Sequence, residues 1–330
     1  MIFRYLRWLF SSFLIFVFSC TNNKLKNQNT EYIEENTSRI VIYYTNDEHG
    51  RIEKSQFTDG AAKMMGLWRT NEGYNGDDKF LILSGGDNWT GPAISTWFKG
   101  ESTVDVMNAM EYDASAIGNH EFNFQVEGLY DRIEQANFPY LSANIREVTS
   151  GKIPDFATPY IIKDIAGIMV GIIGLTTTST PYISFPVIVL DYNFIDYSTA
   201  LENIVPQVKK DGAELLIVIA HINYSEMVGL VPVLVDLGIS AIGGGHYHSG
   251  IVSKIIDGVA VMKSSAFLQN YAKLEITFNT VEKEVVSMEP STHLNENGNP
   301  DQAIADKVSY WRERMDSEIS ESISNIDGGT

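Results

Sequence analysis

From Arg39 to Met288 the chain alternates short apolar runs with stretches of helical spacing, and this alternation limits the fold more than any other feature. The pattern is typical of an α/β domain, in which helices cover sheets built from apolar strands. Strands are predicted over residues 40–45, 80–83, 114–117, 140–143, 169–175, 214–220 and 239–242. Helices are predicted over residues 103–110, 126–136, 199–210 and 228–237.

The pattern changes after Gly243. Residues 251–256 and 259–263 flank Asp257-Gly258, which predicts a hairpin turn. Two further strands are predicted over 272–278 and 284–288. One polar helix is expected from about residue 301 to 320.

Composition limits the partners. The chain has 330 residues, of which 44% are hydrophobic and 20% charged, as in ordinary globular proteins. The formal net charge of −18 argues against a nucleic-acid polymer or an anionic lipid surface as partner, because long-range electrostatics would repel both. The single cysteine, Cys20, excludes an intramolecular disulfide.

The N-terminus has the pattern of an export signal. Arg4 and Arg7 precede an apolar run over 8–18, which is short for a membrane span. The run ends in Val-Phe-Ser-Cys20, which resembles a bacterial lipobox. We therefore expect a signal peptide over 1–19, a lipid on Cys20, a flexible tether over 20–38, and export to the periplasmic or cell-surface face of a bacterial membrane. An uncleaved anchor, or an ordinary signal in which Cys20 is incidental, is the alternative.

Polar side chains follow five of the predicted strands at their carboxyl ends, where open α/β sheets bind ligands. Five of the six histidines are among them. Taken alone, each cluster is more typical of a loop, a turn or a hydrogen-bonded structural histidine. Together they predict one site built from Asp47, His49, Asp87, Asn119, His120, His221, His246 and His248.

Imidazole, carboxylate and amide oxygen suit divalent ions such as Zn²⁺, Mn²⁺ or Fe²⁺. No thiolate is available, which argues against a structural zinc site. The ligands are too many for one ion and suit two ions that share a carboxylate. Two such ions can stabilise both the attacking and the leaving oxygen of an in-line displacement.

The series Asp47-x-His49, Gly86-Asp87, Gly118-Asn119-His120-Glu121, His221 and Gly245-His246-x-His248 resembles the calcineurin-like metallophosphoesterases. The stretches TNDEHG, GGDNWTG and GGGHYH resemble their 5′-nucleotidase and 2′,3′-cyclic-nucleotide phosphodiesterase branch. The resemblance implies an α/β fold of two stacked mixed β-sheets flanked by helices, a four-layer sandwich, over residues 39–297.

The resemblance also implies roles for the site residues. Asp47, His49 and His248 would hold one ion, and Asn119, His221 and His246 the other. Asp87 would bridge the two ions. His120 would face the phosphate, and a metal-bound hydroxide would be the nucleophile.

Two features depart from the 5′-nucleotidase pattern. Asn123 stands where many of these enzymes carry an aspartate that orients the catalytic histidine, whereas the cyclic phosphodiesterases often read NHEFN as this chain does. Family members usually continue into a second domain whose aromatic residues stack on the base. Residues 298–330 are expected to be the linker helix, with that domain absent and a separately encoded C-terminal-domain protein as a candidate partner.

Other residues keep two interpretations. Arg51 is expected to meet a phosphate or to form a surface salt bridge. Trp89 and Trp97 are expected to line a substrate cleft or, with more support, to pack beneath their loop. His293 is expected to be a solvated residue of a polar loop.

The sequence therefore predicts a dimetal phosphoric ester hydrolase that acts on nucleotides or similar small phosphate esters outside the cytoplasm. A thiosulfohydrolase-like sulfur-ester hydrolase is one alternative. A metal-binding subunit that is active only with a partner is the other.

Overall fold

The computed structural model describes residues 36–327. The predicted signal peptide, Cys20 and nearly all of the predicted tether lie outside these residues. Among the helices of residues 36–327, none has both the length and the apolar character needed to cross a bilayer.

The first of two six-stranded sheets is mixed. Its strands β1 (Thr37–Thr45), β2 (Phe80–Ser84), β3 (Ala114–Ala116) and β4 (Tyr140–Leu141) run parallel. Two antiparallel strands, β13 (Asn270–Asn279) and β14 (Glu284–Leu294), extend the sheet on the outer side of β1, giving the order β14-β13-β1-β2-β3-β4.

The second sheet has the order β11-β12-β10-β9-β7-β6. Its parallel part consists of β7 (Ile168–Thr176), β9 (Leu215–His221), β10 (Ala241–Gly243) and β12 (Val259–Lys263). The antiparallel strands β6 (Tyr160–Ile165) and β11 (Val252–Ile256) form the two edges. A separate pair joins β5 (Ile145–Glu147) to β8 (Tyr192–Phe194).

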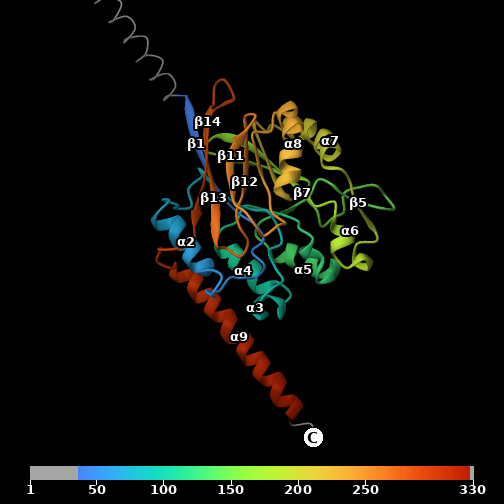
Figure 1. Ribbon diagram of the computed structural model, residues 1–330, viewed down its shortest axis with the longest axis vertical. Helices are drawn as coiled ribbons and strands as arrows, with labels where there is room; N and C mark the ends of the chain where they lie inside the picture. The colour runs from blue at the N-terminus through green and yellow to red at the C-terminus, as the bar shows by residue number, and fades with distance from the viewer. Residues whose placement is uncertain (1–35, 328–330) are drawn as a thin grey trace, which may run out of the picture.

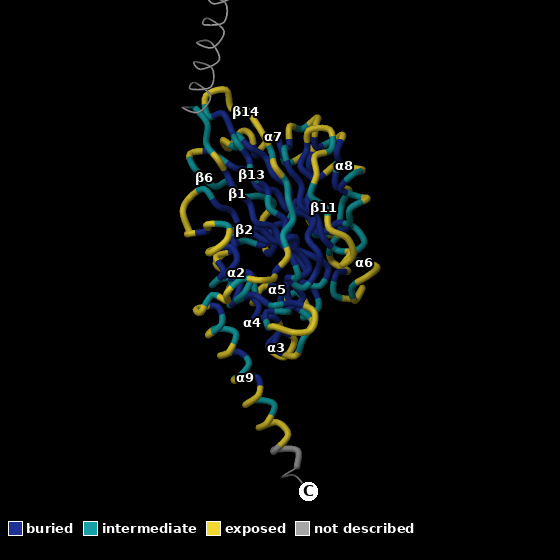
Figure 2. The backbone as a smooth tube through the Cα atoms, turned by 60° about the vertical axis from the view of Figure 1, so that its left-hand side comes forward, coloured by how far each residue is buried: buried dark blue, intermediate teal, exposed yellow. Residues whose placement is uncertain are grey.

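The two sheets stack on a shared apolar core. Side chains alternate across each strand, so Ile42 of β1 faces the second sheet while its neighbour Tyr43 faces the helices. The outer face of the first sheet is covered by α2 (Gly60–Thr70), α4 (Glu101–Ala109), α5 (Gln125–Gln135) and α9 (Gln302–Asp327). The outer face of the second is covered by α7 (Tyr197–Lys210) and α8 (Tyr224–Leu237) (Figure 1). The predicted four-layer α/β sandwich is confirmed, and its strands are the buried centre of the molecule (Figure 2).

Short helices connect the layers. They are α3 (Ala93–Thr96), α6 (Thr180–Ile183) and the 3₁₀ turns η1 (His120–Phe122) and η2 (Pro186–Ile188). Helix α8 begins in a capping box between Asn223 and Glu226 and ends at Gly238, which adopts the left-handed conformation that favours glycine.

All predicted strands and helices are present, most with ends shifted by at most four residues, whereas β14 continues to Leu294 and α9 to Asp327. Helix α2, strand β6 and the β5–β8 pair were not predicted, and β1 starts within the expected tether. The expectation of a loop at His293 is wrong, because this residue lies in β14. Its ring stacks on Tyr271 and its Nδ1 lies 3.5 Å from Glu72 Oε1.

The C-terminal helix α9 packs on the domain along its first half. Ile304, Trp311 and Met315 are buried against α2 and α4, and Trp311 Nε1 donates to Asp105 Oδ2 at 2.8 Å. The second half extends away from the two sheets (Figures 1 and 2). These three apolar side chains therefore fix the first half of α9 to the domain.

Candidate metal centre

The predicted ligands lie at the carboxyl ends of five strands. Asp47 and His49 follow β1, Asp87 follows β2, and Asn119 follows β3. His221 is the last residue of β9, and the segment with His246 and His248 follows β10. Because β1 to β3 are parallel in one sheet and β9 and β10 are parallel in the other, stacking the sheets brings these ends together.

Asp47, His49 and His248 form the first group of side chains that could hold an ion. Nε2 of His49 lies 3.0 Å from Nε2 of His248, and Oδ1 of Asp47 lies 3.5 Å from the latter nitrogen. Asp47 is fully buried, whereas the His248 side chain is 45% exposed. The group therefore has one side open to solvent.

Asp87, His221 and His246 form the second group. His221 and Asp87 are buried, and the His221 and His246 ring centroids lie 5.1 Å apart. Asp87 Oδ2 lies 2.9 Å from His221 Nε2 and 3.9 Å from His49 Nε2. One carboxylate thus lies between the two groups, and with His49 and His120 it forms a third set of side chains that could hold an ion.

Backbone carbonyls set the orientation of two histidines. His49 Nδ1 lies 3.0 Å from the Thr90 carbonyl and His221 Nδ1 lies 2.8 Å from the Gly85 carbonyl. Because a carbonyl only accepts, both Nδ1 atoms carry a proton, and Nε2 is the nitrogen of each ring that is left to bind a metal.

The backbone at the site is strained. Asp47, His49, Asp87 and His246 have φ values of 53°, 46°, 59° and 73°. Each such non-glycine residue costs on the order of 1–3 kcal/mol, and strain of this kind persists where surrounding contacts enforce it. Gly118 shows how tight the packing is, since a Cβ there would lie 2.1 Å from Asp87 Oδ1.

Three buried ligand atoms accept or donate no hydrogen bond, and such atoms indicate whether the site suits metal ions. They are Asp47 Oδ1, Asn119 Oδ1 and His221 Nε2. His221 Nε2 nevertheless lies 2.9 Å from Asp87 Oδ2, within ion-pair distance. Buried polar atoms left without partners are costly, and a cation beside them would remove that cost. The residues present therefore fit divalent ions.

Electrostatics sets the protonation states of the candidate ligands in the metal-free protein. Burial lowers the pKa of His49 and of His246, so both rings are neutral at pH 7. Burial opposes ionisation of Asp87, but the adjacent rings of His221 and His49 outweigh it and lower the pKa of this carboxyl. Burial likewise lowers the pKa of His221, but Asp87 outweighs burial and raises it.

His120 lies beside the first group, with its ring centroid 4.9 Å from that of His49. Its Nδ1 donates to Asn123 Oδ1, and Thr90 Oγ1 lies 3.3 Å from the same oxygen. The backbone N–H of His120 donates to Asp87 Oδ1 at 2.8 Å. His120 and Asn123 are therefore in contact, with the amide oxygen of Asn123 as the acceptor.

Two buried acids beneath the ligands received no role in the sequence analysis. Glu121 accepts from the backbone N–H groups of Asp87, Asn88 and Gly118 at 2.6–2.8 Å. Glu48 accepts from Ser84 Oγ and from Asn88 Nδ2. Burial raises the pKa of Glu48 to about 7 and that of Glu121 to about 8. Their position directly beside His49 and His120 in the sequence is the signal that could have identified them.

Arg51 lies at the rim of the site. Its guanidinium carbon is 4.6 Å from the Phe57 ring centroid and 4.4 Å from that of Phe267. The Phe267 ring in turn packs against His49 and His248, at 5.8 and 5.0 Å. No ion pair of Arg51 occurs among residues 36–327, so the salt-bridge alternative has no partner there.

The two tryptophans occupy different places. Trp89 is fully buried against Tyr140, in agreement with the packing interpretation, and offers no surface to a ligand. Trp97 is 46% exposed, but its Nε1 donates at 3.0 Å to Glu318 of α9.

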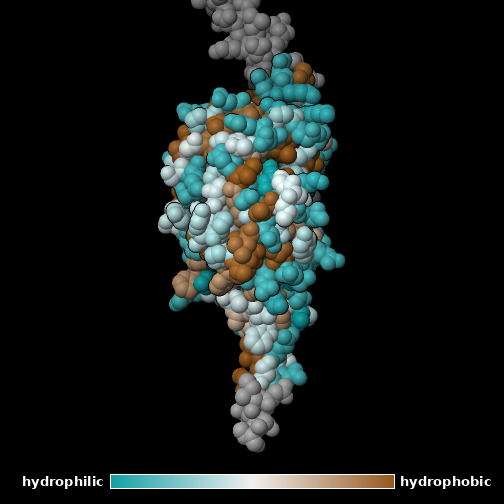
Figure 3. All heavy atoms as spheres, turned by 90° about the vertical axis from the view of Figure 1, so that its right-hand side faces the viewer, coloured by the Kyte–Doolittle hydropathy of each residue, from teal (hydrophilic) through white to brown (hydrophobic). Residues whose placement is uncertain are grey.

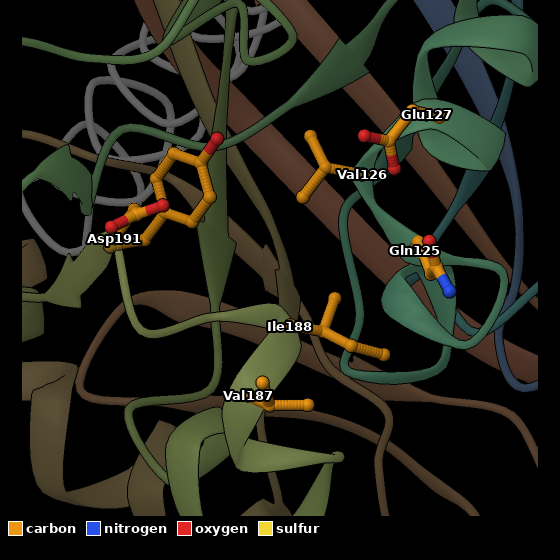
Figure 4. Close-up of a pocket in the computed structure, with 7 residues that line it drawn as sticks. Gln125, Val126, Glu127, Val187, Ile188 and Asp191 are labelled. Atoms are coloured by element: carbon orange, nitrogen blue, oxygen red, sulfur yellow. The ribbon is translucent and has the colours of Figure 1, made fainter.

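A separate pocket of about 400 Å³ lies between the start of α5 and the η2–β8 segment (Figure 4). Val126, Val187 and Ile188 line it together with Glu127 and Asp191, and it includes none of the predicted ligands. The neighbouring segment is apolar and exposed at Tyr182, Ile183, Phe185, Val187 and Leu190. Hydrophobic side chains also gather on the face turned toward the viewer in Figure 3.

Comparison with known proteins gives a consistent result. The 5′-nucleotidase of Bos taurus is 30% identical over 326 residues, covering 88% of this chain and 56% of the bovine protein. The 5′-nucleotidase of Vibrio cholerae is 35% identical over 196 residues, covering 58% of this chain and 35% of that protein. The chain is a homologue of the 5′-nucleotidases.

The fold of this 5′-nucleotidase homologue is that of a calcineurin-like phosphoesterase. The solved structure of YfkN from Bacillus subtilis, a protein of that description, superposes with a TM-score of 0.75 at 19% identity and covers 84% of this chain and 98% of that one. No family model matches the chain. The 5′-nucleotidase homologue spans about half the length of the curated relatives it matches.

Proposed function

We propose that this chain hydrolyses phosphate esters of nucleotides with two divalent metal ions. The observation that carries the proposal is the set of buried ligand atoms at the strand ends, where Asp47 Oδ1 and Asn119 Oδ1 accept no hydrogen bond and His221 Nε2 lies 2.9 Å from the Asp87 carboxylate. The likeness to 5′-nucleotidases supports nucleotides as the substrate class.

Seven side chains would hold the ions. Asp87 would serve both ions, and the remaining ligands would divide into Asp47, His49 and His248 for one and Asn119, His221 and His246 for the other. Their donor set suits Zn²⁺, Mn²⁺ or Fe²⁺. When bound, such ions supply Lewis-acid polarisation of the phosphoryl group and make water a stronger nucleophile at neutral pH.

His120 acts on the reacting phosphate. Asn123 holds its Nδ1–H, so Nε2 is the nitrogen available to substrate. In its protonated form, His120 stabilises negative charge on the phosphoryl oxygens. It then gives the Nε2 proton to the leaving oxygen as the phosphorus–oxygen bond breaks. Because Asn123 is neutral, it fixes the ring without stabilising the imidazolium as a carboxylate would.

Arg51 binds a substrate oxygen in this proposal. The Phe57 and Phe267 rings hold the guanidinium plane, and its Nε is buried without a partner. A guanidinium packed against aromatic rings keeps its N–H edge for planar recognition of a phosphate.

The enzyme acts outside the cytoplasm, held by a lipid on Cys20. The lipobox-like end of the apolar N-terminal run supports this location. Cys20→Ala is expected to release the protein from the membrane fraction or to block its processing. Unchanged retention and processing would remove the anchor from the proposal.

The decisive experiment is a substrate panel. The purified chain without its signal peptide is tested with 5′-, 3′- and 2′,3′-cyclic nucleotides and a thiosulfate ester, each with Mn²⁺, Zn²⁺ or Co²⁺. Release of phosphate from a nucleotide is expected. Hydrolysis of the sulfur ester alone, or of none of the compounds, would contradict the proposal.

A further inference from the structure

Lys263, the last residue of β12, is a buried cation that the proposed chemistry does not use. The residue is 1% exposed, and its Nζ donates to three backbone carbonyls. The acceptors are Gly250 at 3.1 Å, Ser249 at 3.2 Å and Ser264 at 3.3 Å. No ion pair of Lys263 occurs in the described part of the chain. A buried ammonium is costly unless its protons are satisfied, so these carbonyls account for its place in the fold.

Two of the three carbonyls belong to the residues that directly follow His248. Residues 247–251 are all exposed, and the His248 side chain is 45% exposed. A surface segment of this kind is held by few packed neighbours and opens easily. The bonds from Lys263 hold the segment from beneath, on the side away from solvent.

The end of β12 also contacts the strand ends that carry other ligands. The carbonyl of Met262 accepts from the Gly244 N–H at 2.9 Å. The backbone N–H and the hydroxyl of Ser264 donate to Asn46 Oδ1, at 2.9 and 2.7 Å. Lys263 therefore lies between the segment before Asp47 and the segment after His248.

We propose that Lys263 is a positioning residue for the metal centre, which fixes His248 against Asp47 and His49 through the carbonyls of Ser249 and Gly250. The inference rests on the proposed function, in which these three side chains hold an ion. Lys263 is therefore expected to affect the ion held by Asp47, His49 and His248, and not the ion held by the second group of ligands.

The test measures metal binding directly. The chain without its signal peptide is stripped with a chelator and titrated calorimetrically with Mn²⁺, as wild type and as Lys263→Met. Two sites are expected in the wild type. Lys263→Met should weaken one of them by roughly 10- to 100-fold, the usual cost of removing a group that orients a ligand. Amide hydrogen exchange should also become faster over residues 248–251.

Lys263→Gln keeps one donor and is the second variant if the Met variant does not fold. It should weaken the same site by a smaller factor. Lys273→Met is the matched control. Lys273 lies in β13 and is also largely buried, but it pairs with the carboxylates of Glu72 and Glu275. The control is expected to lower stability and to leave both Mn²⁺ affinities within about twofold of wild type.

Two results of the titration would overturn the inference. In the first, both Mn²⁺ affinities of the Lys263 variants stay within about twofold of wild type. In the second, Lys263→Met and Lys273→Met weaken Mn²⁺ binding equally.

If the wild type bound no Mn²⁺, the proposed function would fail on its own account. Hydrogen exchange would then test Lys263 separately, and unchanged exchange over residues 248–251 in Lys263→Met would reject its role.

Discussion

His221 Nε2 lies 2.9 Å from Asp87 Oδ2 inside the protein, within ion-pair distance. His221 Nδ1 donates to the Gly85 carbonyl, so Nε2 is the nitrogen turned toward Asp87. Burial lowers the pKa of His221, but Asp87 outweighs burial and raises it, so a proton on Nε2 balances the buried carboxylate when no metal is bound. A divalent cation would take the place of that proton, because metal binding to such ligands releases protons.

Asp87→Asn is expected to disrupt the metal pair, because the amide removes the charge that both groups share. Elemental analysis of the purified variant should find fewer than two ions per chain. Asp77→Asn, an exposed residue whose carboxylate pairs with Lys79, is the control and should retain the wild-type content. Two ions in the Asp87 variant would reject its bridging role.

His120→Asn is expected to retain both ions and to lower kcat by roughly 10²- to 10⁴-fold, the usual contribution of a positioned acid or base. Asn123→Ala should lower kcat less, since it frees the His120 ring but leaves it present. Steady-state kinetics and metal analysis on the same preparations check both outcomes. Full activity in the His120 variant would contradict its role.

Trp311→Ala is expected to lower the free energy of unfolding by about 3–5 kcal/mol, because the ring is buried against Phe98 and loses its bond to Asp105. Tyr310→Ala, at a neighbouring residue that is 56% exposed, should change stability little. Urea denaturation measures both variants. Equal effects would mean that α9 does not depend on this contact.

Glu72 should make stability depend on pH. Burial raises the pKa of its carboxyl, but hydrogen bonds from Lys273 and Tyr271 outweigh burial and lower it. A depressed folded-state pKa contributes stability above the unfolded value, and this contribution is lost as pH falls through the folded value. The stability difference between wild type and Glu72→Gln should therefore be larger at pH 7 than at pH 3. The same stability difference at both pH values would contradict a lowered pKa of Glu72.

The central strands of the sheets are predictable because they are apolar runs buried on both faces, which leave a clear signal in the sequence. Helix α2 leaves a weaker one, since it includes Gly60 and Gly66. A Cβ at Gly66 would lie 1.8 Å from the Asn299 carbonyl, so a contact with a distant segment explains this glycine. Long-range packing of this kind is not visible in a local pattern.

Some parts of the site can likewise be predicted from the sequence, and others cannot. The ligands follow strand ends, and parallel pairing brings strand ends together, so their proximity can be predicted. His120 and Asn123 are three residues apart, and their contact is local. Lys263 and Phe267 reach the site only because β12 and the segment after it pass beside Asn46 and His49. Their contacts depend on the register of whole strands, which the sequence alone did not specify.

One titration tests the central claim most directly. The chain without its signal peptide is stripped with a chelator, and hydrolysis of a 5′-nucleotide is followed as Mn²⁺ is added. The account predicts no phosphate release from the stripped chain and full activity after about two equivalents of Mn²⁺. Activity that survives complete removal of metal, or that saturates at one equivalent, would contradict it.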